Sequence, residues 1–144
     1  MKVIYNSIIP FKGFAYMNFF GILFGRNEYK NNLTRRTYTH ESIHSEQYKD
    51  LLYIFFLPLY LLEWIIKIPF GWFYKKTKNG YKISKVAYRS ISFEQEAFYN
   101  QYDYDYLNKR KRYTWIKYIF TMYDPDKEIT KSGPEEYIKP EDIK

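Results

Sequence analysis

Residues 34–56 read TRRTYTHESIHSEQYKDLLYIFF, and this stretch contains neither glycine nor proline. Thr34 belongs to the residue types that cap helix N-termini, so we expect one helix over these residues. The only two histidines of the chain, His40 and His44, lie four positions apart within it, with Glu41 directly after the first. Because residues i and i+4 share a helix face, both imidazole rings can reach the same point in space.

Two histidines at this spacing, with a glutamate after the first, are typical of a helix that binds zinc. A catalytic zinc usually has three protein ligands, and the chain has no cysteine and no further histidine, so the third ligand must be a carboxylate. Glu94 and Glu96 are the strongest candidates, and Glu63 remains open. We expect His40 and His44 to bind Zn²⁺ and Glu41 to act as a general base. The alternative is a chance pair of histidines on a solvated helix.

Toward the N-terminus, apolar residues alternate loosely with small or polar ones and are interrupted by Pro10, Gly13 and Gly21. This pattern predicts short strands near residues 3–9, 15–19 and 21–24, forming a small antiparallel sheet. The expected fold class is therefore α+β: a small N-terminal antiparallel sheet followed by three or four helices packed around the H-E-S-I-H helix. We expect one domain over residues 1–123 and a flexible charged tail over residues 124–144.

Residues 51–74, LLYIFFLPLYLLEWIIKIPFGWFY, form the most apolar stretch of the chain. Its length would span a bilayer, but Glu63, Lys67 and two prolines argue against a span. We expect a helical hairpin bent at Pro58, buried in the core or lying on a membrane face, with Glu63 turned inward toward a polar partner. The lysines of the basic turn that follows, residues 75–82 around Asn79, would then lie near an anionic membrane surface.

In the C-terminal half, we expect a helix from Ser84 or Ser92 to Lys109, with Ser92 and Gln95 in capping-box spacing. A shorter helix is expected over residues 113–122.

The net charge of +7 is compatible with nucleic acid or an anionic membrane as a partner, but the basic residues are spread along the chain. Nucleic-acid binding is therefore not expected. The absence of cysteine excludes disulfides and thiolate zinc sites. No signal peptide is apparent, so we expect a cytoplasmic protein with peripheral membrane association.

The order of motifs resembles that of gluzincins, in which H-E-x-x-H is followed by a glutamate on a later helix. The second motif of the CAAX-processing type of membrane peptidase, S-R-x-x-E-x-x-A-D, is similar to residues 90–98, SISFEQEAF. Ser90, Glu94 and Ala97 match it, whereas Ile91 and Phe98 replace the arginine and the aspartate. The resemblance implies that Glu94, rather than Glu96, is the third ligand.

The chain also resembles small uncharacterised H-E-x-x-H proteins of Bacteroidetes, which share the stretches found here at residues 40–47, 63–64, 91–98 and 103–107. We therefore expect a zinc-dependent metallohydrolase of gluzincin type, a peptidase in which Glu41 deprotonates zinc-bound water. Its partner would be a peptide or protein substrate, held along a strand of residues 15–24. The alternative is a non-catalytic membrane- or partner-binding protein with a structural or relic zinc site. An RNA-binding module is disfavoured because no Gly-aromatic recognition motif occurs.

Overall fold

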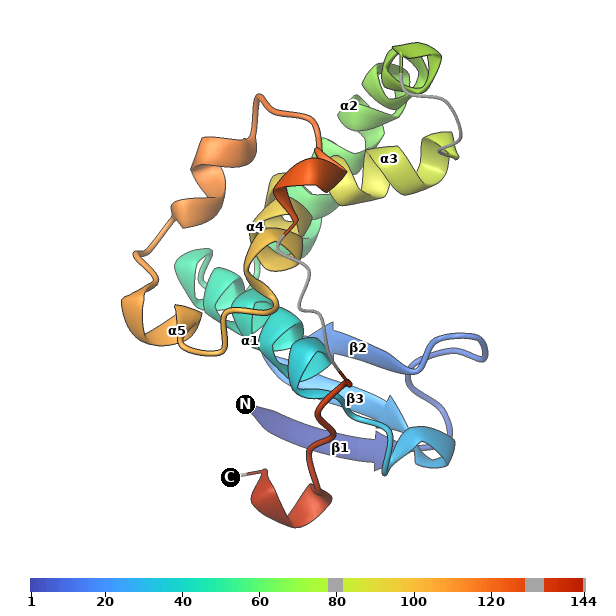
Figure 1. Cartoon of the computed structure of the whole chain (residues 1–144), viewed down its shortest axis with the longest axis vertical. Helices are drawn as coiled ribbons and strands as arrows, with labels where there is room; N and C mark the ends of the chain where they lie inside the picture. The colour runs from blue at the N-terminus through green and yellow to red at the C-terminus, as the bar shows by residue number, and fades with distance from the viewer. Residues whose placement is uncertain (78–81, 129–133, 144) are drawn as a thin grey trace.

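The computed structural model of this chain describes residues 1–77, 82–128 and 134–143, in which a small sheet precedes a set of helices (Figure 1). The strands are β1 (Lys2–Asn6), β2 (Tyr16–Phe19) and β3 (Ile22–Arg26). The α-helices are α1 (Arg35–Asp50), α2 (Phe56–Thr77), α3 (Ile83–Ser90), α4 (Ser92–Asn100) and α5 (Tyr106–Lys109). The 3₁₀-helices are η1 (Asn27–Tyr29), η2 (Thr114–Tyr118), η3 (Pro125–Lys127) and η4 (Pro140–Asp142). The predicted α+β class is confirmed.

The sheet has the strand order β1-β3-β2 and is mixed, so the prediction of a purely antiparallel sheet is wrong. β2 and β3 form an antiparallel hairpin whose turn residues, Phe20 and Gly21, both have positive φ angles. This turn geometry matches the twist of paired strands. β1 ends where the Asn6 side chain accepts hydrogen bonds from the backbone N–H groups of Ile8 and Ile9. The long connection after Asn6 lets β1 pair in parallel with β3 on the side away from β2.

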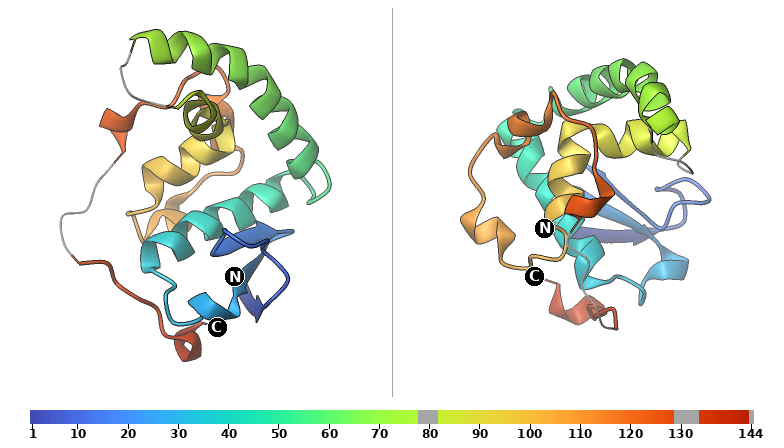
Figure 2. Two further views of the ribbon diagram at one scale, coloured as in Figure 1. Left: turned by 90° about the vertical axis from the view of Figure 1, so that its right-hand side faces the viewer. Right: turned by 45° about the horizontal axis from the view of Figure 1, so that its top comes forward.

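α1 lies between the sheet and the other long helices, and it is shorter than the sequence predicts (Figures 1 and 2). The Thr34 side chain caps it as expected, by accepting a hydrogen bond from the Thr37 N–H. The helix ends at Asp50 because Leu52 and Tyr53 adopt left-handed backbone conformations. The Tyr53 N–H donates back to the Tyr48 carbonyl, which satisfies a carbonyl at the helix end.

α2 is a single helix from Phe56 to Thr77, so the predicted hairpin bent at Pro58 is wrong. Pro58 falls in the first turn, where a missing N–H removes no helical hydrogen bond. The reversal of the chain occurs earlier, at Leu52 and Tyr53. Asn79 lies outside the described residues, as do the other residues of 78–81 in the predicted basic turn. Within the part of the chain that the structure describes, no helix has both the length and the apolarity needed to cross a bilayer.

The helix predicted to run to Lys109 is divided into α3, α4 and α5. The break between α3 and α4 falls at Ile91, whose extended backbone precedes the first residue of α4. The predicted capping box of Ser92 and Gln95 does not form. Instead, the Glu63 carboxylate accepts hydrogen bonds from the Ser92 N–H and hydroxyl, at 2.8 and 2.6 Å. The expected inward orientation of Glu63 is confirmed, and this contact fixes the start of α4 against α2.

An aromatic core holds α1, α2 and α4 together. Phe93 of α4 packs against Phe56 of α2 and Trp115 of η2, with ring centroids 4.8 and 4.6 Å apart. The ring centroids of Tyr48, on α1, and Phe56 are 4.0 Å apart. The core therefore positions the first turn of α4, and with it Glu94, opposite α1.

Residues 135–138 of the predicted C-terminal tail contact the start of α1. Tyr137 forms an isolated β-bridge with Thr34, and the Arg35 N–H donates to the Glu136 carbonyl at 2.7 Å. The flexibility of residues 124–144 stays a prediction.

Candidate metal centre

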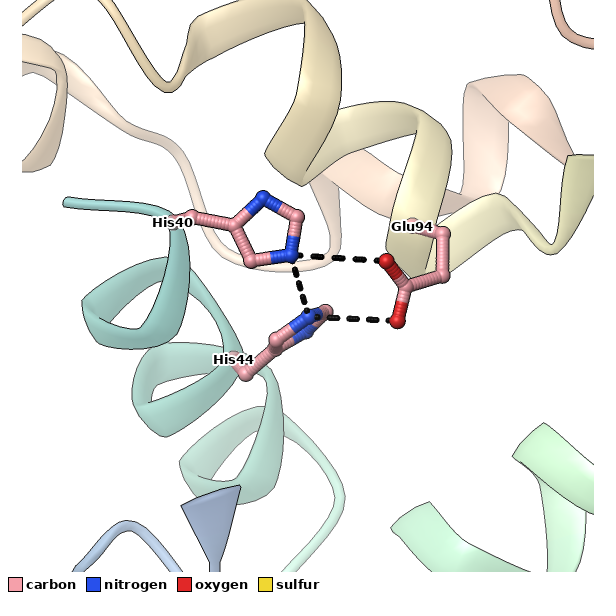
Figure 3. A group of neighbouring side chains, drawn as sticks. All are labelled: His40, His44 and Glu94. Atoms are coloured by element: carbon pink, nitrogen blue, oxygen red, sulfur yellow. Dashed lines mark hydrogen bonds and ion pairs between the residues drawn. The ribbon is translucent and has the colours of Figure 1, made fainter. Parts of the chain in front are cut away.

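His40 and His44 lie on one face of α1, and Glu94 approaches them from α4 (Figure 3). The two histidine Nε2 atoms are 3.2 Å apart, and each is 3.4 Å from a different oxygen of Glu94. All three side chains are buried, and together they form a group that could hold a metal ion. The predicted convergence of these residues is confirmed, whereas their role as ligands stays a prediction.

The spacing of these atoms is close to that around a tetrahedral ion. Two ligand atoms that each lie about 2.1 Å from such an ion are about 3.4 Å from one another. The two Nε2 atoms are 3.2 Å apart, and each lies 3.4 Å from a different oxygen of Glu94. With one oxygen of Glu94, the three donor atoms lie within 4.8 Å of one another, so the side chains would move closer together to coordinate an ion placed between them.

Glu94 also has a buried oxygen that lacks a hydrogen-bond donor. Within the described residues, Oε2 finds no hydrogen-bond partner, although the side chain is only 3% exposed. A buried carboxylate oxygen without a donor is costly, and a cation would remove that cost. The second oxygen, Oε1, accepts a hydrogen bond from the Tyr60 hydroxyl at 2.7 Å, which orients the carboxylate.

The other two candidate carboxylates face elsewhere. Glu63 accepts hydrogen bonds from Ser92 and forms an ion pair with Lys67 at 3.3 Å. Glu96 is fully buried and is paired with Arg110 at 2.7 Å. Neither belongs to the histidine group, so the structure brings Glu94, and not Glu63 or Glu96, to the histidines.

Gln47 determines which nitrogen of His44 faces Glu94. Its side-chain nitrogen lies 3.0 Å from both the Phe93 carbonyl and a Glu96 oxygen, and both of these groups only accept hydrogen bonds. The amide oxygen of Gln47 must therefore accept a hydrogen bond from His44 Nδ1, at 2.7 Å. In the neutral imidazole the proton then resides on Nδ1, so Nε2 is the nitrogen whose lone pair a metal would use once it displaces the second proton.

Glu96 is the centre of a buried network behind this contact. Beyond Gln47, it accepts hydrogen bonds from the Tyr106 hydroxyl at 3.0 Å and from Arg110 Nε at 2.7 Å. Arg110 also donates to Asp50, the last residue of α1, at 2.8 Å. This network joins α1, α4 and α5 on the side of Gln47 that is opposite to His44.

The charges within the group shift the pKa values of its members in opposite directions. Burial alone would lower the pKa of His44, but Glu94, with help from Glu41 and Gln47, raises it to about 9. Burial alone would raise the pKa of Glu94, but the two imidazoles hold it well below its usual range. In the metal-free protein, His44 and Glu94 therefore form a charged pair at neutral pH.

Glu41 lies next to this group without being one of its three members. With His44 and Glu94, it lines a pocket of about 270 Å³ that Met17 and Phe19 of β2 also line. Burial raises the pKa of Glu41, and the two histidines partly oppose that shift. A carboxyl group with a raised pKa binds a proton more readily, which is a property that a general base needs.

Asn18 attaches β2 to the H-E-S-I-H segment. Its side-chain nitrogen donates to the Glu41 carbonyl at 2.7 Å and to the Ser45 hydroxyl at 2.9 Å. Its oxygen accepts from the Gly21 N–H at 3.0 Å, at the turn of the hairpin. One wall of the pocket is thus fixed to the helix that carries both histidines.

Sequence reasoning missed the parts played by Tyr60, Gln47 and Asn18. Tyr60 lies within residues 51–74, which the sequence predicts as a hairpin. One signal was available in α2: Tyr60, Glu63 and Lys67 follow helical spacing and share a face. Asn18 left no such signal, because its role depends on how β2 packs.

Comparisons with known proteins found no relative. No protein-family model, no curated protein and no solved structure matches this chain.

Proposed function

We propose that the protein is a zinc-dependent hydrolase that cleaves peptide bonds, with His40, His44 and Glu94 as ligands and Glu41 as general base. The observation that carries this proposal is that Glu41 lines the same pocket as His44 and Glu94, two members of the metal group. The likeness to gluzincins belongs to the proposal and rests on residues 40–44 and 90–98.

The donor set suits zinc. Two imidazoles and one carboxylate, without a thiolate, are a ligand set of catalytic zinc sites that keep a position for substrate or water. When bound, zinc would polarise a substrate carbonyl and make water a better nucleophile. The open position would face the pocket, since Glu94 and His44 both line it.

Glu41 would accept the proton that the attacking water loses. Its carboxylate lines the pocket beside His44 but is separate from the three donor groups. The raised pKa of Glu41 would let it keep this proton briefly and then donate it to the leaving amine. The Asn18 contact with the Glu41 carbonyl supports the backbone at this position.

A peptide substrate is favoured by the strand that walls the pocket. β2 is at the end of the strand order β1-β3-β2, and its residues Tyr16, Met17 and Phe19 line the pocket. An extended peptide can add to such an edge through main-chain hydrogen bonds, which would place one of its carbonyls near the metal group.

The test is hydrolysis of a mixed peptide library by zinc-loaded protein, followed by mass spectrometry. We expect cleavage that a chelator stops, and a rate about 10²–10⁴-fold lower in the Glu41→Gln variant. Glu46→Gln is the matched control, because Glu46 lies on the same helix but forms an ion pair with Lys49 near the surface. Zinc-loaded protein that cleaves no peptide, or a Glu41→Gln variant as active as Glu46→Gln, would overturn the proposal.

A further inference from the structure

α2 exposes apolar side chains and hides its charged ones. Among residues 56–72, every exposed residue is apolar. The exposed residues include Leu61, Leu62, Ile65, Ile66, Ile68 and Phe70. A surface helix normally has the opposite arrangement, with its apolar stripe toward the core. Figure 2 shows α2, in green, along the outer edge of the molecule.

The two charged residues of this part of α2 point into the protein. The side chains of Glu63 and Lys67 are only 14% and 6% exposed, and they form an ion pair with one another. Glu63 also binds the first residue of α4, and Lys67 donates to the carbonyls of Ser90 and Thr121, both at 2.7 Å. The outward surface of the helix is therefore left without a charged side chain over residues 56–72.

The apolar surface continues beyond α2. On one side, a groove of about 540 Å³ lies between α2 and residues 115–122, lined by Leu62, Ile66 and Phe70 and by Phe120. The Phe120 side chain is 99% exposed. At the start of the helix, Leu52 and Ile54 are also exposed. The exposed apolar residues of α2 and of the groove are together too numerous for an ordinary solvated surface.

The charges around this region are positive. Glu63 is the only acidic residue between Asp50 and Glu94, and none occurs from residue 106 to residue 123. Exposed lysines are present in both stretches: Lys85 on α3 and Lys117 in η2. α3 packs directly on α2, because a Cβ atom at Gly71 would lie 3.2 Å from the Ile83 carbonyl oxygen.

We propose that this face binds an anionic lipid bilayer, with α2 lying in the plane of the headgroups. An apolar helix surface bordered by lysines matches the acyl boundary and the anionic headgroups of such a membrane. Trp64 and Trp72, both exposed on α2, are residues that favour this interface. A second copy of the chain fits less well, since it would bring lysines against lysines.

The test is flotation of the purified full chain with lipid vesicles. We expect binding to vesicles of phosphatidylglycerol and phosphatidylcholine in equal parts, and much weaker binding to phosphatidylcholine alone. A variant with Leu61→Gln and Ile65→Gln should bind the anionic vesicles about tenfold less, since two exposed apolar side chains are lost. Tyr137→Gln is the control, because Tyr137 is equally exposed but lies on the C-terminal segment.

Tryptophan fluorescence provides a second measurement in the same samples. Emission should shift to shorter wavelength when anionic vesicles are added to the parent protein or to Tyr137→Gln, but not with the double variant. The proposal is wrong if the parent chain does not float, if it binds neutral vesicles equally well, or if the double variant binds anionic vesicles as strongly as the parent. It is also overturned if this face instead forms a dimer in solution that the double variant dissociates.

Discussion

Arg110 binds both oxygens of Glu96, through Nε at 2.7 Å and Nη2 at 3.2 Å, and both side chains are almost completely buried. Removal of one partner from a buried ion pair leaves the other charge without compensation. Glu96 in turn holds the Gln47 amide that orients His44. The pair therefore contributes to the fold and to the geometry of the metal group together.

Arg110→Met should lower the free energy of unfolding by about 3–5 kcal/mol, because Glu96 and Asp50 would both lose their buried partner. Chemical denaturation measures this change. Arg36→Met is the control, since its ion pair with Glu135 is exposed and should contribute less than about 1 kcal/mol. An equal decrease in the free energy of unfolding in both variants would contradict a stabilising role for the buried Arg110 ion pairs.

Gln47→Leu should weaken zinc binding about 10–100-fold, because His44 Nδ1 loses the acceptor that fixes its tautomer. Competition against a chelating dye measures the dissociation constant. Gln101→Leu is the matched control: it also removes a buried amide, but one that donates to Glu128. An unchanged dissociation constant in Gln47→Leu would show that the tautomer is fixed by some other contact.

The stability of the metal-free protein should depend on pH through His44 and Glu94. The raised pKa of His44 contributes stability that is complete below its ordinary value of 6.5 and is lost as the pH rises toward about 9. The lowered pKa of Glu94 contributes stability that is present above its ordinary value of 4.5 and is lost under stronger acid. The contribution of this pair should therefore be largest between pH 4.5 and 6.5.

Urea denaturation of the metal-free protein from pH 6.5 to pH 9 tests the prediction. The measured quantity is the difference in free energy of unfolding between the parent and Glu94→Gln, in which the carboxylate charge is absent. That difference should decrease from pH 6.5 to pH 9. A difference that stays constant or increases would mean that His44 does not gain a proton beside Glu94.

Zinc should raise the melting temperature of the protein, because the proposed ligands come from α1 and α4 and an ion would join these helices. At a free zinc concentration of about 100 times the dissociation constant, the gain is about 2.7 kcal/mol, or on the order of 10 °C for a chain of this size. Thermal unfolding should show this rise in the parent and in Glu41→Gln, but not in His44→Ala. Loss of the rise in Glu41→Gln would make Glu41 a ligand.

Local signals in the sequence predicted where α1 begins and that its two histidines share one face. The Thr34 cap and the i, i+4 spacing of His40 and His44 depend only on neighbouring residues, so they could be read without the fold. Local signals did not identify Glu94 as the third member of the group. Residue types alone left Glu63 and Glu96 as alternatives, and the choice of Glu94 came from a resemblance to gluzincins.

Long-range packing explains what the sequence did not predict. Pro58 indicated a bend, but its effect depends on where the helix starts, and the start is set by left-handed conformations at Leu52 and Tyr53 that neither residue type favours. The parallel pairing of β1 likewise depends on a tertiary arrangement. Gln47 can orient His44 only because Phe93 and Glu96, on α4, accept hydrogen bonds from its side-chain nitrogen.

Phe93, at the centre of the aromatic core, is directly followed by Glu94 in the first turn of α4. The carboxylate therefore cannot move away from the histidines by fraying of a helix end, because that turn is held by Phe56 and Trp115. Opening of this turn would require opening of the core, so the hydrogen-bonded amides of Ser92 and Gln95 should exchange slowly. A bound ion would then leave through the pocket beside Glu41, and its residence time would be determined by ligand exchange rather than by local unfolding.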